Sequence, residues 1–204
     1  MKFDNVLKEL IEKNKTIEEA LRRLPSRRIK SDKAIIENLT KLAYFFFSNN
    51  QESEAMVICN ELAKIDFNND YDYWTWIEYS LCLRAELSLK TNDNEKRKES
   101  IALIKDALMS GDGLAKKIKI QVHERFMNGE GINLDEIQID NKTIPVAEEF
   151  ETRMIYLMKL LKVKAFGGSK VLGLSQVDTQ IQNNLSLIKN IINKVGQSHI
   201  PFFN

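Results

Sequence analysis

The amino-acid sequence predicts a mostly α-helical protein. Its 204 residues include only three prolines and eight glycines, which is few for a chain built from many tight turns. Apolar residues recur at spacings of three and four along most of the chain, as they do on one face of a helix. We therefore predict antiparallel helical hairpins, in a repeat-like α bundle or solenoid, with one small β-hairpin near 135–146.

The length of the chain suits one domain. Hydrophobic residues make up 43% of the sequence and charged residues 29%, which is ordinary for a globular protein. We predict a single helical domain over residues 1–204. The alternative is a subdivision into a repeat-like part, 1–128, and a hairpin with two long helices, 129–204.

Apolar spacing and capping residues predict the helices of the first third of the chain. Segment 3–14 places its apolar residues on one helical face. Thr16, with Glu19 three residues later, forms a capping box for the next helix, which Pro25 ends. Two further helices are predicted, one from Ser31 or Asp32 to about Phe47 and one over 53–64.

Segment 72–90 is apolar nearly all round, which predicts a helix buried at the centre of the protein. Helices over 95–109 and 114–127 follow it. The period then changes to alternation, with Ile137 and Ile139 before Ile144 and Val146, and this pattern predicts the hairpin. The chain closes with predicted helices over 147–165 and 176–195 and an apolar tail, 199–204, that we expect to dock on the protein.

Segment 36–65 resembles a degenerate tetratricopeptide repeat. The residues at the family's large, small, aromatic and second small positions are Leu42, Ala43, Phe46 and Ala55. The segment departs from the family at Asn50, where glycine is usual, and at Cys59, where an aromatic residue is usual. The resemblance implies a concave surface for a peptide or protein partner.

Charge is distributed unevenly in a nearly neutral chain. The net charge of +1 argues against a dedicated nucleic-acid-binding protein, which is usually strongly basic. Residues 51–94 hold nine acids and three bases, a balance of −6, whereas 1–50 and 161–204 each have a balance of +4. A charged partner of the acidic segment is therefore expected to be a basic protein.

The two cysteines, Cys59 and Cys82, both have apolar neighbours and are predicted to be buried free thiols. Their spacing does not suggest a disulfide framework, so we expect a reducing cytoplasm. The N-terminal residues show no signal-peptide core. No apolar run approaches the roughly 18 residues that suggest a membrane span, so no membrane contact is expected.

The stretch "DFNNDYDYWTW", residues 66–76, resembles the start of a calcium loop. Asp66, Asn68 and Asp70 supply oxygens at positions one, three and five, but Tyr71 replaces the turn glycine and Ile77 the closing glutamate. Without the turn and the bidentate ligand, the geometry for calcium is lost. We therefore predict no metal site.

Two interpretations of this stretch remain. One is a turn between helices, with Asp70 or Asp72 as the helix N-cap. The other is a partner-binding surface of acids and exposed aromatic residues, since aromatic residues are enriched in binding hot spots. Its candidate residues are Asp66, Asp70, Tyr71, Asp72 and Trp76.

Other motifs fall short of a chemical site. His123 and His199 have no neighbouring ligands at metal spacing, and the "GGSK" at 167–170 lacks the spacing and the preceding strand of a phosphate-binding loop. We predict no catalytic residues and no cofactor. The function that fits is a non-enzymatic cytoplasmic protein-binding module such as a bacterial toxin-immunity protein. The alternatives are a general helical-repeat adaptor and an enzyme with a dispersed active site.

Overall fold

The computed structural model describes residues 3–67, 71–128, 146–168, 173–196 and 200–203. These residues form helices and no strand. The α-helices are α1 (Asp4–Lys13), α2 (Lys15–Arg23), α3 (Asp32–Ser48), α4 (Glu52–Leu62), α5 (Tyr71–Lys90), α6 (Asn94–Met109), α7 (Gly113–Met127), α8 (Val146–Ala165) and α9 (Leu174–Val195), with short 3-10 helices η1 (Ser26–Ile29) and η4 (Pro201–Phe203).

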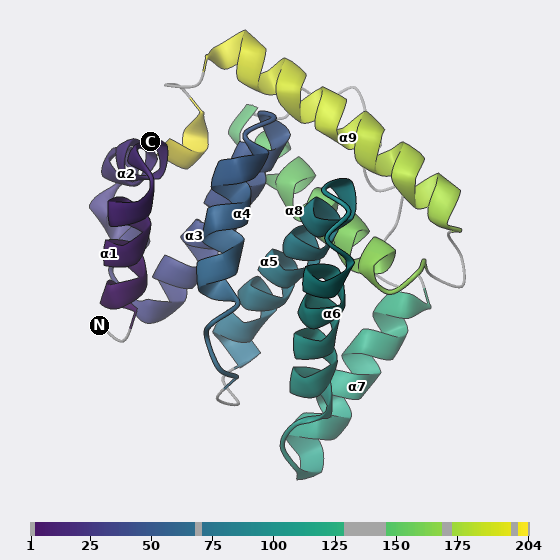
Figure 1. Cartoon of the computed structure of the whole chain (residues 1–204). Coiled ribbons are helices and arrows are strands. Elements are labelled where there is room, and N and C mark those ends of the chain that lie inside the picture. Colours follow the sequence, from purple (N-terminus) through teal and green to yellow (C-terminus); the bar gives the residue numbers. More distant parts are fainter. Residues whose placement is uncertain (1–2, 68–70, 129–145, 169–172, 197–199, 204) are drawn as a thin grey trace.

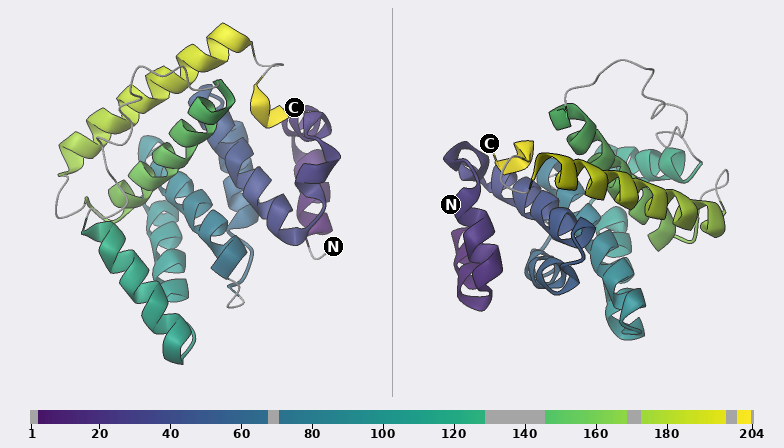
Figure 2. Two further views of the ribbon diagram at one scale, coloured as in Figure 1. Left: turned by 180° about the vertical axis from the view of Figure 1, so that it is seen from behind. Right: turned by 90° about the horizontal axis from the view of Figure 1, so that it is seen from above.

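Neighbouring helices in the sequence lie side by side in space (Figure 1). Helix α3 contacts both α4 and α5, α5 contacts α6, and α6 contacts α7. Helix α8 returns to lie against α5, and α9 then lies against α8 and runs across one end of the row (Figure 2). The predicted mostly α architecture is confirmed. The tetratricopeptide resemblance stays a prediction.

Helix α5 occupies the centre, as its uniform apolarity predicts. It contacts α3, α4, α6 and α8, and Ile77, Leu81 and Leu83 are completely or almost completely buried. Burial of this many apolar side chains is the main favourable term in folding. The helices around α5 therefore share one core.

Two helix starts show how local capping decides the boundaries. Ser31 caps α3, since its hydroxyl accepts a hydrogen bond from the backbone N–H of Ala34 at 3.2 Å. The predicted cap at Thr16 is wrong, because α2 begins earlier, at Lys15. Asn14 is the N-cap, and its side-chain oxygen accepts from the backbone N–H groups of Thr16 (2.9 Å) and Ile17 (3.2 Å).

The predicted hairpin near 135–146 lies outside the described residues except for Val146. That residue begins α8 and is helical, so its predicted place in a strand is wrong. Glu149 follows in the first turn of α8, where the helix dipole favours an acid.

The apolar tail docks on the protein, as expected. Phe202 and Phe203 of η4 are buried, and the Phe203 ring lies edge-on to Phe45 with centroids 5.2 Å apart. The guanidinium of Arg23 lies 4.3 Å from the centroid of Phe203, and that of Arg28 lies 5.3 Å from Phe202. The tail therefore joins α8 to the N-terminal helices. None of the helices among the described residues is long and apolar enough to cross a membrane.

Candidate functional site

The structure separates the residues of the acidic and aromatic stretch. Asp66 is exposed, Asp70 lies outside the described residues, and Tyr71 and Asp72 are the first two residues of α5. Asp72 is thus inside the helix and is not its N-cap. Trp76 is half-buried one turn further on. Of the proposed surface, the described side chains are those of Asp66 and Trp76.

Most acids of segment 51–94 are paired with bases, several of them from other parts of the chain. Glu61 is buried and accepts from Lys13 of α1 and, at 2.7 Å, from Lys64. The remaining pairs among the described acids are Glu52–Lys90 (2.5 Å), Glu78–Lys162 (3.0 Å), Glu86–Lys164 (2.8 Å) and Asp93–Lys96 (2.9 Å). Four of these bases, Lys13, Lys96, Lys162 and Lys164, lie outside the segment, so its surplus of acids is partly neutralised within the protein.

Trp76 contacts two residues of α3, Thr40 and Lys41. The Nζ of Lys41 lies 5.3 Å from the Trp76 ring centroid, and the hydroxyl of Thr40 donates to the Trp76 carbonyl at 3.1 Å. Lys41 also forms an ion pair with Glu37 at 2.8 Å. A cation over a tryptophan face is attracted by the ring, so Trp76 and Glu37 both stabilise the position of Lys41 on the surface of α3.

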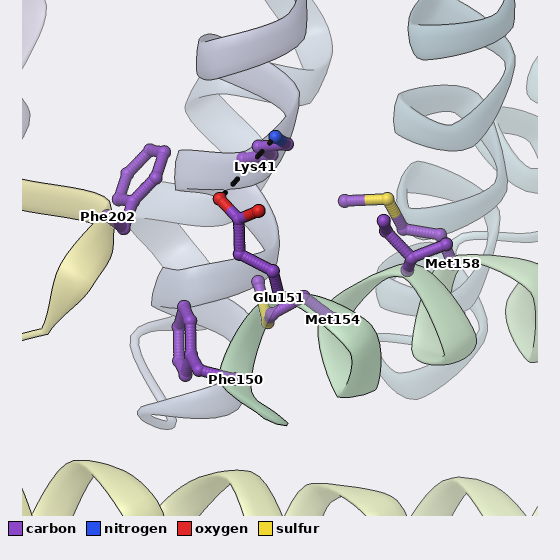
Figure 3. Close-up of a pocket in the computed structure, with 7 residues that line it drawn as sticks. Lys41, Phe150, Glu151, Met154, Met158 and Phe202 are labelled. Carbon is purple, nitrogen blue, oxygen red and sulfur yellow. Dashed lines mark ion pairs between the residues drawn. The ribbon is translucent and has the colours of Figure 1, made fainter. Parts of the chain in front are cut away.

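Beside Lys41 lies a shallow hollow that is partly open to solvent, which we call the α3–α8 groove. Its walls come from three elements that are distant in the sequence (Figure 3). It is lined by Lys41 of α3, by Phe150, Glu151, Met154, Ile155 and Met158 of α8, and by Phe202 of η4.

The spacing of residues along α8 builds this groove. Phe150, Met154 and Met158 are four residues apart, so they share one face of the helix, and all three are buried. Glu151 and Ile155 lie one position further on and form its rim, with 44% of the Glu151 side chain and 37% of Ile155 exposed. The groove therefore has an apolar floor and an exposed rim with one carboxylate.

Glu151 forms two long ion pairs at the rim of the groove, with Lys41 and with Arg28. Its carboxylate points toward Lys41 (Figure 3), and its oxygen is 3.9 Å from Lys41 Nζ and 4.0 Å from Arg28 Nη1. Both distances are too long for hydrogen bonds. Glu151 thus remains able to accept hydrogen bonds from a cation of a partner.

Among the described residues, Cys59, Cys82 and His123 do not line the groove. Burial raises the pKa of the Cys59 thiol to about 12 and raises that of Cys82 further, so neither forms a thiolate readily. Burial and then Lys162 lower the pKa of His123, whose ring lies 4.7 Å from that of Phe166. In the described part of the chain, no three His, Cys, Asp or Glu side chains are grouped to hold a metal ion.

The sequence pattern identifies Phe150, Met154 and Met158 as one face of a helix, but it does not identify a groove. The signal that was missed is the combination of this face with the apolar tail, which contributes Phe202.

A family model described as a family of unknown function, DUF6707, matches residues 3–190. The chain belongs to this family. Neither the curated proteins nor the solved structures include a significant match to it.

The region of this chain that matches the DUF6707 model extends from α1 to most of α9. It contains six of the seven residues that line the groove. Phe202 lies beyond residue 190, in the tail that docks against α8. The groove is therefore built largely, but not completely, from the region that defines the family.

Proposed function

We propose that this chain is a non-enzymatic protein-binding module whose α3–α8 groove receives an apolar side chain of a partner protein. The observation that supports this proposal is the apolar floor of Phe150, Met154 and Met158 beneath the exposed rim of Glu151 and Ile155. Thioether side chains adapt their shape to different apolar groups, which suits a recognition surface.

The partner residue beside the apolar anchor is a lysine or arginine. Glu151 is the partly exposed acid at the groove, and its ion pairs with Lys41 (3.9 Å) and Arg28 (4.0 Å) are too long to be hydrogen bonds. An ion pair at the edge of an apolar anchor contributes mainly to specificity and to the rate of association. The basic partner expected from the sequence is thus proposed to bind at Glu151, with the exposed Asp66 as a secondary contribution.

We favour the role of a toxin-immunity protein, in which the partner is the toxin that this chain neutralises. The alternative role is a general helical-repeat adaptor. Both roles use the same groove, because the tetratricopeptide-like segment 36–65 contributes Lys41 to it. We propose a cytoplasmic location, which is supported by the two buried free thiols of Cys59 and Cys82.

The proposal that a partner binds at the groove can be tested in the cells that make the protein. A photo-crosslinking residue replaces Ile155 in the full-length chain. The matched control is Leu187 on α9, which is apolar and similarly exposed, at 41% against 37% for Ile155. We expect one discrete protein to be linked from position 155 and not from 187. The absence of such a link would refute the proposal.

The linked protein is then purified and titrated against the wild type and three variants. We expect Glu151→Lys to weaken binding about tenfold or more, equivalent to about 1.4 kcal/mol, and Glu151→Gln to reduce mainly the association rate at low salt. Asp66→Lys should have a smaller effect. If Glu151→Lys binds as well as the wild type and Asp66→Lys does not, the acidic stretch is the binding surface instead of the groove.

A further inference from the structure

The C-terminal tail, residues 200–203, places an aromatic ring of the chain itself in the α3–α8 groove. Phe202 lines the groove together with residues of α3 and α8, and it is only 2% exposed. Its ring lies on the same side of Glu151 as the ring of Phe150, whereas Met158 lies on the other side (Figure 3). One end of the groove is thus occupied by an aromatic side chain of this chain.

The groups at this end of the groove are ones that attract an aromatic ring. The guanidinium of Arg28 lies 5.3 Å from the centroid of Phe202, within the range of a cation–π interaction. The groove is also lined by the ring of Phe150 and the thioether of Met154, and both kinds of group pack favourably against aromatic rings. This end of the groove therefore favours an aromatic side chain over an aliphatic one.

The tail is held on both sides of Phe202 by other side chains. Ile200 and Phe203 are 0% and 7% exposed, and the Phe203 ring packs edge-on against Phe45. Gly196 ends α9 with a φ of 75°, which favours glycine, so the tail docks as a segment separate from that helix. The Phe202 ring can therefore turn out of the groove while the rest of the tail stays docked, a rotamer change of a kind that is common at interfaces.

We propose that the partner presents an aromatic side chain that replaces the Phe202 ring in the groove, so that the tail and the partner compete for one site. This inference rests on the proposed function, since it states which apolar side chain the groove receives. A ring on the same chain competes at a high effective concentration. It lowers the apparent affinity for the partner in proportion to the fraction of molecules whose site is open. The tail thereby selects for partners with an aromatic anchor.

A small aromatic probe tests the site without the partner. In the full-length chain, Phe202→Ala leaves a ring-sized space in the groove, and N-acetylphenylalanine amide is titrated while NMR follows the methyl group of Met154. We expect a saturable shift with a dissociation constant on the order of 1 mM. N-acetylleucine amide should bind at least about threefold more weakly, because it gains no cation–π interaction with Arg28. The wild type should show no saturable shift, because Phe202 fills the site.

The control variant is Phe166→Ala. Phe166 follows the last residue of α8 and does not line the groove, so its removal should leave the Met154 methyl group unresponsive to the probe. If circular dichroism shows that Phe202→Ala does not fold, Phe202→Leu keeps an apolar side chain in the tail and should give the same order of affinities. A folded variant in which Met154 does not respond, or in which the two probes bind equally, overturns the inference.

The protein linked from Ile155 tests the competition. We expect it to bind Phe202→Ala at least about threefold more tightly than the wild type, because the site is then open in every molecule. Equal or weaker binding to Phe202→Ala would overturn the inference, since Phe202 would then not compete with the partner, while the proposed function would stand. If no protein is linked from Ile155, the proposed function fails, and the replacement of Phe202 by a partner fails with it, whatever the probe titration shows.

Discussion

Replacing Ala55 with leucine is predicted to destabilise the protein by about 1–3 kcal/mol through overpacking. Ala55 is fully buried on α4, which lies against both α3 and α5. Leucine has three more carbons than alanine. If the site had room for them, their burial would add about 2–3 kcal/mol of stability. The change in the free energy of unfolding therefore has opposite signs in the two cases, so the substitution distinguishes a closely packed site from one with spare room.

The assay is urea unfolding followed by circular dichroism, with Ala102→Leu as the matched control. Ala102 is exposed on α6, and the same substitution there should change the free energy of unfolding by less than about 0.5 kcal/mol. Ala55→Leu should also lower the thermal midpoint by about 2–12 °C for a chain of this size. An unchanged or raised midpoint in Ala55→Leu would refute the close packing of α4 between its neighbours.

Three further predictions use charge and burial. Hydrogen bonds from Lys13 and neighbouring groups lower the pKa of Glu9 from 4.5 to about 2. The stabilising contribution of this carboxylate is present above pH 4.5 and is lost as the pH falls toward 2. Between those pH values, the urea midpoint should therefore change less with pH in Glu9→Gln than in the wild type. Cys59 and Cys82 should react with a thiol reagent only after urea unfolding, because burial raises the pKa of both. Calcium titration calorimetry should give no specific binding, because Ile77, at the position of the closing glutamate, is buried in the core.

Several helices could be predicted from the apolar pattern nearly to their ends. The helix predicted over 72–90 is α5, Tyr71–Lys90, and the one predicted over 176–195 is α9, Leu174–Val195. The start of α2 was predicted wrongly at Thr16, because Asn and Thr are both good N-cap residues. Asn14 is the cap because its side chain reaches two backbone N–H groups, which depends on a loop conformation that local pattern does not encode.

The groove could not be predicted, because its walls come from distant parts of the chain. A periodic pattern identifies which face of a helix such as α8 is apolar. It does not identify which other elements cover that face. The docking of Phe202 beside Lys41 depends on tertiary packing, and it leaves the Glu151 side of the helix exposed.

The charge of segment 51–94 gave a partly misleading picture for the same physical reason. Glu61 on α4 is paired with Lys13 of α1, and Glu78 and Glu86 on α5 are paired with Lys162 and Lys164 of α8. A charge buried in a helix interface is costly unless it is paired, so the acidic and basic segments of a nearly neutral chain favour packing against one another. The number of acids in a segment therefore says little about its exposed surface. An acid that remains partly exposed beside an apolar floor, as Glu151 does, is a better guide to a basic partner than the acidity of the segment.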